Sequence, residues 1–371
     1  MLTLSRLVLT DFRNYAALTW RPEARITVLT GPNGSGKTNF LEAIALLTPG
    51  RGFGRGRMAD LARIGGSGTW AVAGRVTEGA TSTEIGTGTL AASPDRRVFR
   101  LDGAEPRSQA ELASRIAAIW LTPQMDTLFQ ESAAGRRRFL DRLVWALEPG
   151  HARSASAYET ASAERRRVLA QARDRGAAPD PAWLSGLEDA CARHAVALSA
   201  ARADFVARLN AAPAASSFPA ARMVLHDPVA DRLAGEPALA VEDWLRREFA
   251  SRRAADAAAN TSTLGAHRAD MQLADAATGQ PANTASTGQQ KTMLLAIILA
   301  HTALITEARG QAPLILLDEP AVHLDARRRD ALWAELGRLP AQVFMTGTDA
   351  EIFGALHKEA TFFRTGGGAL R

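Results

Sequence analysis

Apolar and polar residues follow three successive patterns along the chain. Residues 1 to about 125 contain short apolar runs, several with a period of two, which predict strands near 2–10, 16–20, 25–31, 68–77, 82–92, 97–101 and 117–122 and one helix near 37–47. Between about 134 and 258, long segments rich in Ala, Arg, Glu and Leu predict helices, with breaks at 176–181 and 211–219 where Gly, Pro and Ser gather. After 260, strands and helices alternate again, at 271–273, 287–307, 313–318, 326–336, 342–346 and 360–364.

This order predicts an α/β domain that is built from both ends of the chain. We expect residues 1–133 and 260–371 to form that domain and residues 134–259 to form a helical insertion. A length of 371 residues is enough for about two domains.

Composition adds limits on the class of protein. A hydrophobic share of 46% and a charged share of 22% are typical of soluble globular proteins, and no uninterrupted apolar run approaches the roughly 20 residues that span a bilayer. The first ten residues resemble a strand and not a signal peptide. The single cysteine, Cys191, excludes an intrachain disulfide, so we expect a cytoplasmic protein without membrane association. The net charge of +5 is compatible with a polyanionic partner, although an arginine-rich composition explains it equally well.

A glycine-rich loop stands between an apolar run and an amphipathic segment. The loop GPNGSGKT covers residues 31–38, after the run 25–30 and before 39–46, which is the strand–loop–helix order of a P-loop. Backbone N–H groups of such a loop bind phosphates, Lys37 reaches the β and γ oxygens, and Thr38 ligates magnesium. Lys37 is one of only three lysines among 44 basic residues, which indicates a need for a compact ammonium group. The sequence therefore predicts ATP and Mg²⁺ as ligands.

A second apolar run, residues 314–317, ends in two acids. Beside a P-loop, Asp318 would hold Mg²⁺ and Glu319 would polarise the attacking water as a general base. The alternative is the start of a helix at Glu319-Pro320 without any catalytic role.

The order of the remaining motifs resembles the ATPase heads of the ABC class. A Ser-Thr-Gly-Gln-Gln segment begins at Ser286, His323-Leu-Asp325 follows the acidic strand end, and Gln124 follows a strand in the position of a Q-loop glutamine. In that class the serine reaches a nucleotide bound by the opposite subunit. By this resemblance the ATP-binding residues are Asn33, Gly34, Gly36, Lys37, Thr38, Asn39, Ser286, Gly288, Gln289 and Asp325, the catalytic residues are Glu319 and Gln124, and the metal-binding residues are Thr38, Gln124 and Asp318.

A longer set of motifs is similar to the RecF family of DNA replication and repair proteins. The motifs are LVLTDFRNY at 7–15, GPNGSGKTNFLEAI at 31–44, RRRFLD at 136–141, GAHRAD at 265–270, STGQQKT at 286–292 and QVFMT at 342–346. The resemblance implies an ATP-dependent homodimer with slow, DNA-stimulated ATP hydrolysis. It also implies binding to gapped DNA or single-strand/double-strand junctions, and cooperation with RecO and RecR mediators in gap repair and recombinase loading.

Three positions depart from the related patterns. Glu319 stands where many RecF members carry a second aspartate, and Gln124 stands where many carry glutamate. Thr346-Gly-Thr348 replaces the histidine of transporter-type switch loops. The first two departures make the head more like a general ABC ATPase, so its hydrolysis can differ from that of other members.

Arginines in two segments are the candidates for contacts to DNA phosphates. Arg51, Arg55 and Arg57 belong to the glycine-rich loop at 48–57, and Arg136, Arg137 and Arg138 stand at a predicted helix start. The alternative is that these arginines form ordinary solvated faces.

Three other classes of protein share parts of the pattern. A transporter ATPase subunit would carry the switch histidine and an LSGGQ segment. An SMC-like structural ATPase would need a long heptad repeat where this insertion is broken within about 60 residues. A nuclease fused to an ABC head would need a further acidic metal cluster after the head.

Overall fold

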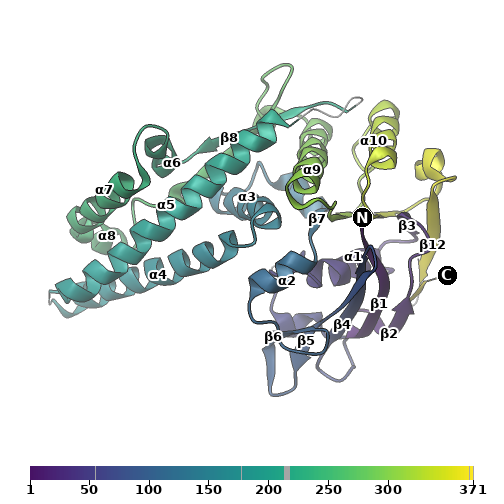
Figure 1. Cartoon of the computed structure of the whole chain (residues 1–371), viewed down its shortest axis with the longest axis horizontal. Coiled ribbons are helices and arrows are strands. Elements are labelled where there is room, and N and C mark those ends of the chain that lie inside the picture. Colours follow the sequence, from purple (N-terminus) through teal and green to yellow (C-terminus); the bar gives the residue numbers. More distant parts are fainter. Residues whose placement is uncertain (55, 177, 213–217, 367, 371) are drawn as a thin grey trace. The chain divides into compact units, whose positions relative to one another are not determined.

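The computed structural model describes residues 1–54, 56–176, 178–212, 218–366 and 368–370. The chain forms two compact units (Figure 1). The first, called the sheet unit, comprises Met1–Thr127, Ala212–Ala221 and Thr284–Arg371. The second, called the helical unit, comprises Leu128–Ala211 and Arg222–Asn283.

Two sheets make up most of the sheet unit. An antiparallel sheet has the order β2-β1-β4-β5-β6, and a second sheet has the order β13-β12-β3-β11-β10-β7, in which all strands but β13 pair in parallel. The strands of the first sheet are β1 (Leu2–Phe12), β2 (Tyr15–Trp20), β4 (Ala71–Glu78), β5 (Thr81–Leu90) and β6 (Ser93–Leu101). The strands of the second are β3 (Ile26–Thr30), β7 (Ala118–Leu121), β10 (Leu314–Leu317), β11 (Val343–Gly347), β12 (Ala360–Gly366) and β13 (Ala369–Leu370).

Helix α1 (Lys37–Leu46) joins the two sheets through one hydrophobic core. Its Phe40, Leu41 and Ile44 side chains are completely buried. Trp20, at the end of β2, makes edge contacts with Phe40 and with Phe344 of β11. Because β3 ends at residue 30 and α1 begins at residue 37, the core holds both ends of the glycine-rich loop in place.

The sheet unit also contains the α-helices α2 (Gln109–Arg115), α9 (Thr287–Arg309) and α10 (Ala326–Arg338). Helix α9 passes beside β7, which lies at one edge of the second sheet. By length and composition α9 is apolar enough to cross a bilayer, but 67% of its apolar window is buried inside the protein. This burial is typical of a core helix.

The helical unit contains α3 (Ala133–Leu147), α4 (His151–Arg175), α5 (Pro181–Ala211), α6 (Pro228–Leu233), α7 (Ala238–Ser251) and α8 (Arg253–Ala259). Helices α4 and α5 lie side by side (Figure 1), and their apolar residues pack with those of α7. Two strands, β8 (Ala221–His226) and β9 (Asp270–Asp275), pair with each other, and β9 contacts α3.

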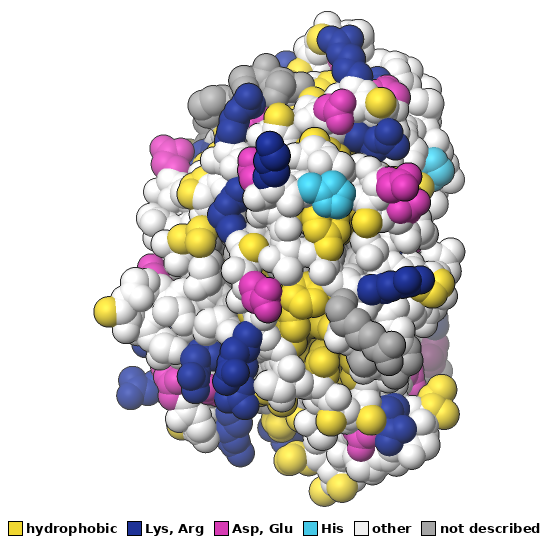
Figure 2. All heavy atoms as spheres, turned by 90° about the vertical axis from the view of Figure 1, so that its right-hand side faces the viewer, with side chains coloured by type: hydrophobic (Ala, Val, Ile, Leu, Met, Phe, Trp, Pro, Cys, Tyr) yellow, Lys and Arg dark blue, Asp and Glu magenta, His cyan; other side chains and the backbone are white. Residues whose placement is uncertain are grey.

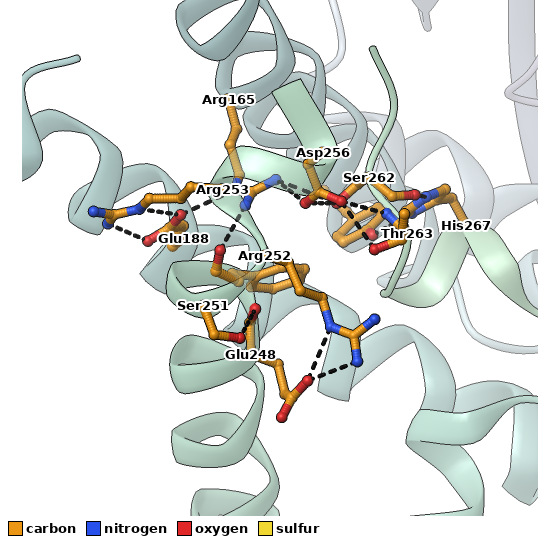
Figure 3. Close-up of polar contacts among 12 residues, drawn as sticks. Arg165, Glu188, Glu248, Ser251, Arg252, Arg253, Asp256, Ser262, Thr263 and His267 are labelled. Atoms are coloured by element: carbon orange, nitrogen blue, oxygen red, sulfur yellow. Dashed lines mark hydrogen bonds and ion pairs between the residues drawn. The ribbon is translucent and has the colours of Figure 1, made fainter. Parts of the chain in front are cut away.

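A buried arginine joins four helices of this unit (Figure 3). Arg165 of α4 is 2% exposed and donates to Glu188 of α5 at 3.1 Å, to Asp256 of α8 at 2.7 Å and to the carbonyl oxygen of Phe249 of α7 at 2.7 Å. Arg253 also contacts Glu188. A planar guanidinium with its donors used in this way fixes the relative rotation of the helices, because a buried charge that loses a partner is strongly destabilising.

Most predicted elements are confirmed, including the P-loop strand and helix, the break before residue 181, α9, β10, α10 and β11. The expectation of continuous helix after residue 219 is wrong at β8. There the side chain of Asn210 pairs with both the N–H and the carbonyl oxygen of Met223, at 2.9 and 2.8 Å, in the manner of a neighbouring strand. The prediction also missed α2, which is capped by the Ser108 hydroxyl. The boundaries expected from the sequence, with an insertion at 134–259, stay a prediction; the compact helical unit comprises Leu128–Ala211 and Arg222–Asn283.

Candidate nucleotide site

Residues 31–38 need glycine at some positions because the backbone has positive φ there, and at others also because a side chain would clash with its neighbours. Gly31, Gly34 and Gly36 have φ values of 141°, 78° and 106°, which L side chains rarely adopt. A Cβ at Gly36 would lie 2.3 Å from Nδ2 of Asn14, whereas one at Gly34 would meet nothing within 4 Å. Gly36 is also the N-cap of α1, so the loop ends at a positive helix dipole. The backbone is therefore shaped to receive phosphate groups.

Lys37 and Asn39 are held by the loop and its surroundings. Lys37 is 4% exposed, and its Nζ donates to the carbonyl oxygens of Gly31 at 2.7 Å and Pro32 at 3.0 Å. Asn39 donates to Oδ1 of Asn14 at 2.8 Å, and Asn33 is exposed on the loop. The ammonium group thus lies inside the curve of the loop.

Thr38, Asp318 and Thr346 form a connected set at the ends of three elements. The Thr38 hydroxyl donates to the two carboxylate oxygens of Asp318 at 2.9 and 3.1 Å, and the Thr346 hydroxyl donates to Oδ1 of Asp318 at 2.6 Å. Asp318 is 2% exposed, and this burial raises its pKa even though both hydroxyls act in the opposite direction. A cation beside Asp318 would offset the cost of its buried charge.

These donors fit Mg²⁺. Mg²⁺ prefers hard oxygen ligands, and the hydroxyl of Thr38 and the carboxylate of Asp318 are of this kind. The two groups already lie within hydrogen-bond distance of each other. Among the described residues there is no group of three or more His, Cys, Asp or Glu side chains that would hold a metal by protein ligands alone. Binding of Mg²⁺ here would therefore depend on nucleotide phosphates and water.

Glu319 has a strained backbone and a half-buried side chain. Its φ is 50°, which is uncommon for a residue with a Cβ, and its N–H donates to the hydroxyl of Thr346 at 2.9 Å. Within the described part of the chain, no hydrogen bond engages its carboxylate. Glu319 is thus placed next to the metal-binding carboxylate with its own oxygens available to contact water.

The turn between β1 and β2 supports the loop. Asn14 donates to the carbonyl oxygen of Ser35 at 3.2 Å, and Tyr15 donates to that of Gly36 at 3.1 Å. Arg13 pairs with the buried Glu42 of α1 at 2.9 Å. We predicted no role for Asn14 and Tyr15. Both belong to the motif LVLTDFRNY at 7–15, but that motif does not reveal their contacts, which are made to a loop more than 20 residues away.

The predicted residues of α9 lie at its first turn. The Ser286 hydroxyl accepts from the N–H of Gln289 at 3.3 Å, and Oε1 of Gln289 accepts from the N–H of Ser286 at 2.8 Å, which is a capping box. A Cβ at Gly288 would lie 2.6 Å from the carbonyl oxygen of His323, so the loop 323–325 passes directly against this turn. Asp325 caps α10. Among the described contacts none joins Ser286 to the P-loop of its own chain.

Gln124 has no described contact with the predicted metal ligands. It belongs to a 3-10 helix at Pro123–Thr127, its side chain is exposed, and no described hydrogen bond joins it to Thr38 or Asp318. The structure thus brings Thr38, Asp318 and Glu319 together, and the roles of Gln124 stay predictions.

The predicted DNA-contact arginines differ in their surroundings. Arg51 and Arg57 are exposed, while Arg55 lies outside the described residues. Arg136 is bound by both oxygens of Asp270 at 2.7 Å, and this hydrogen bonding raises its pKa. Arg137 donates to the carbonyl oxygen of Ala269 at 2.7 Å, and its pKa is lowered by burial and then by the positive charge of Arg202.

A cavity of about 430 Å³ lies within the helical unit. Four arginines line it, together with Tyr158 and His267, and two acids, Asp141 and Glu159. Arg202 is neutralised by Asp141, which it contacts at 2.8 and 2.9 Å. The remaining lining arginines, which give the cavity its positive charge, are Arg137, Arg138 and Arg166.

Comparisons with known proteins agree with this geometry. Residues 3–367 match the family model described as the RecF/RecN/SMC N-terminal domain. The chain is 42% identical over 372 residues to a protein of Mesorhizobium japonicum named DNA replication and repair protein RecF, with 99% of this chain and 97% of the relative covered. A protein of the same name from Rhizobium etli is 40% identical over 373 residues, with 99% and 98% covered.

Solved structures show the same fold. A RecF–ATP structure, described as that of the recombination mediator protein in the RecFOR pathway, has a TM-score of 0.85 at 19% identity and covers 100% of this chain and 97% of its own. An Smc head domain from Pyrococcus furiosus has a TM-score of 0.53 at 14% identity and covers 100% and 96%. The predicted fold class, an ABC-type head formed by both chain ends with a helical insertion, is confirmed. With this head, its P-loop and full-length relatives of the same name, the chain belongs to the RecF family.

Proposed function

We propose that this protein is an ATP-dependent DNA-binding repair protein that dimerises on ATP, hydrolyses it slowly and acts in gap repair and recombinase loading. The observation that carries the proposal is the hydrogen-bonded set of Thr38, Asp318 and Thr346 beside the P-loop, with Glu319 as its neighbour. That set has the parts of an MgATP-hydrolysing site. The relatives' name, DNA replication and repair protein RecF, supports the role in repair.

Different residues of the chain bind the phosphates of ATP, hold Mg²⁺ and activate water. The N–H groups of the loop and the Lys37 ammonium bind phosphate oxygens, and Thr38 with Asp318 would hold Mg²⁺. The ion, when bound, neutralises charge on the β and γ oxygens. Glu319 orients water for attack and accepts its proton.

ATP-dependent dimerisation follows from where α9 begins. Ser286 is exposed, lies at the N-terminus of a 23-residue helix and is backed by the loop 323–325, while its described hydrogen bonds are only those of its cap. A helix N-terminus that is exposed in this way is suited to receive the γ-phosphate of a nucleotide on a second subunit. The start of α9 therefore supports a second copy of the chain as a partner. From membership of the RecF family we also propose DNA with gaps or junctions, and mediators of the RecO and RecR type.

The DNA contacts that we propose are arginines whose charge is not already neutralised by a buried carboxylate. They are Arg51 and Arg57 of the sheet unit, and Arg137, Arg138 and Arg166 in the helical unit. The ion pair of Arg57 with Asp60 at 3.3 Å is exposed, so a phosphate can replace it at little cost. Arg136 is not among the proposed DNA contacts, because its guanidinium already donates to both carboxylate oxygens of Asp270.

The distribution of charged side chains on the face drawn in Figure 2 does not identify the DNA site. Lys and Arg side chains occur there in separate groups with acidic side chains between them, so that face has no single basic patch. The proposed DNA contacts therefore have to be tested one group at a time.

A DNA retention assay tests this proposal. Wild-type protein should be retained on gapped DNA only with ATP, and retention should fall as salt rises. The double variant Arg51→Gln/Arg57→Gln should bind more weakly, with a slope of log affinity against log salt that is smaller by about 2, or about 1 for each phosphate that is no longer neutralised. The control is Arg100→Gln, since Arg100 is exposed on β6 and pairs with Glu105 at 3.7 Å. ATP-independent retention by the wild type would contradict the proposed function, and an unchanged slope in the double variant would remove this loop from the DNA site.

A further inference from the structure

The three lysines of this chain have different environments. Lys37 belongs to the P-loop and Lys358 is exposed, whereas Lys291 of α9 is 0% exposed. Burial of an ammonium group is costly unless it is paired and hydrogen-bonded. A lysine kept in the interior of a chain that otherwise uses arginine therefore needs a reason.

The contacts of Lys291 connect three separate parts of the sheet unit. Its Nζ donates to the backbone carbonyl oxygen of Glu319 at 2.9 Å and to Oδ2 of Asp126 at 3.1 Å. Asp126 belongs to the same 3-10 helix as Gln124, and Lys291 lies only five residues after Ser286. One ammonium group thus links the start of α9, the turn at 123–127 and the residue pair that follows β10.

The contact to Glu319 acts on a strained residue. The φ of Glu319 is 50°, and such conformations persist where the surroundings fix them. The N–H of Glu319 is fixed by Thr346 at 2.9 Å, and its carbonyl oxygen is fixed by Lys291, with a longer contact from the N–H of Val322 at 3.3 Å. Lys291 and Thr346 therefore hold Glu319 from its two sides.

We propose that Lys291 is a positioning residue for hydrolysis, which sets the backbone of Glu319 and couples it to the first turn of α9. The inference rests on the proposed function, because it gives Glu319 the role of general base. Lys291 touches no reacting atom and acts through Glu319. Since Ser286 and Lys291 lie on the same rigid helix start, binding of the second subunit's nucleotide at Ser286 is transmitted to the carboxylate that orients water.

A competing explanation is that Lys291 only balances the charge of Asp126. Oδ1 of Asp126 is buried and has no hydrogen-bond partner among the described residues, so the removal of Lys291 would leave a buried carboxylate without a counter-charge. The variant Lys291→Met alone would then lose activity through misfolding. Replacement of both groups, in Lys291→Met/Asp126→Asn, removes the ion pair without leaving a charge behind.

The experiment compares the wild type with four variants: Lys291→Met/Asp126→Asn, Asp126→Asn, Lys291→Arg and Glu319→Gln. The readouts are the affinity for a fluorescent ATP analogue, kcat and KM for ATP, and the thermal unfolding midpoint. The double variant should keep the wild-type midpoint and ATP affinity but lose about tenfold to a hundredfold in kcat, because a small displacement of a catalytic group is enough for such a loss. Asp126→Asn, which keeps the contact to Glu319, should retain kcat, and Lys291→Arg should recover part of it.

Each other outcome has a defined meaning. Wild-type kcat in the double variant would overturn the inference, as would a loss in Asp126→Asn equal to that of the double variant. A double variant that melts early, beside a Lys291→Arg variant with full kcat, would also overturn it, because a buried positive charge at this position would then be enough to explain Lys291. Full activity in Glu319→Gln would also overturn the inference, because Lys291 would then have no general base to position, whereas a wild type that does not hydrolyse ATP would contradict the proposed function instead.

Discussion

Lys37→Ala should abolish ATP binding. The ammonium group of Lys37 is buried inside the curve of the P-loop, where it meets the carbonyl oxygens of Gly31 and Pro32 and faces the path of the phosphates. Its removal takes away the positive charge for the β and γ oxygens. Arginine should be a poor replacement, because its planar guanidinium is larger than the space an ammonium fills. Equilibrium binding of a fluorescent ATP analogue measures the effect.

Lys358→Ala is the matched control for this experiment. Lys358 is exposed near the start of β12, so its removal changes the net charge by the same amount without touching the loop. The control should bind ATP as the wild type does. Unchanged affinity in Lys37→Ala would contradict the P-loop assignment.

Glu319→Gln should keep ATP binding and lose most hydrolysis. Glutamine has the shape of glutamate, so the contacts of the backbone with Thr346 and Lys291 remain, while the general base is removed. General-base catalysis contributes on the order of 10²–10⁴-fold, and we expect a decrease of that size in kcat. The variant should then accumulate as an ATP-bound dimer, which sedimentation with and without ATP detects.

Glu351→Gln serves as the control for the change in charge, because Glu351 is exposed after β11. It should hydrolyse ATP at the wild-type rate. Full ATPase activity in Glu319→Gln would assign the base elsewhere, first of all to a water held by Gln124.

The parts of the site that could be predicted are those in which neighbours in sequence act together. The strand, glycine loop and helix around residues 31–38 are contiguous, and a P-loop dictates a partner acid at a strand end, which led to Asp318. The contact of Thr38 with Asp318 joins residues 280 positions apart, and the motif order was enough to predict that both belong to one magnesium site.

The parts that could not be predicted depend on partners that are distant and carry no motif. In the sequence Arg136 looks like a free basic residue, but in the structure it is bound by Asp270, which stands 134 positions later. Strand β8 is short and is stabilised by β9 and by Asn210, neither of which is visible in the local pattern. Lys291 stands inside a recognised motif, but its contact with Asp126 spans 165 positions. Tertiary contacts of this kind override local propensity.

We propose that each active site is shared between two subunits, with Ser286 acting on the nucleotide of its partner. Ser286→Arg and Lys37→Ala should each be inactive alone. In a heterodimer of the two variants, one composite site carries both defects and the other carries none.

The most direct measurement is ATP hydrolysis and single-site ATP occlusion in a mixture of these two variants, after exchange of subunits has been demonstrated. If the sites are shared, occlusion returns in heterodimers, and hydrolysis and retention on gapped DNA return in part. Exchanged heterodimers that neither occlude nor hydrolyse ATP would contradict this proposal.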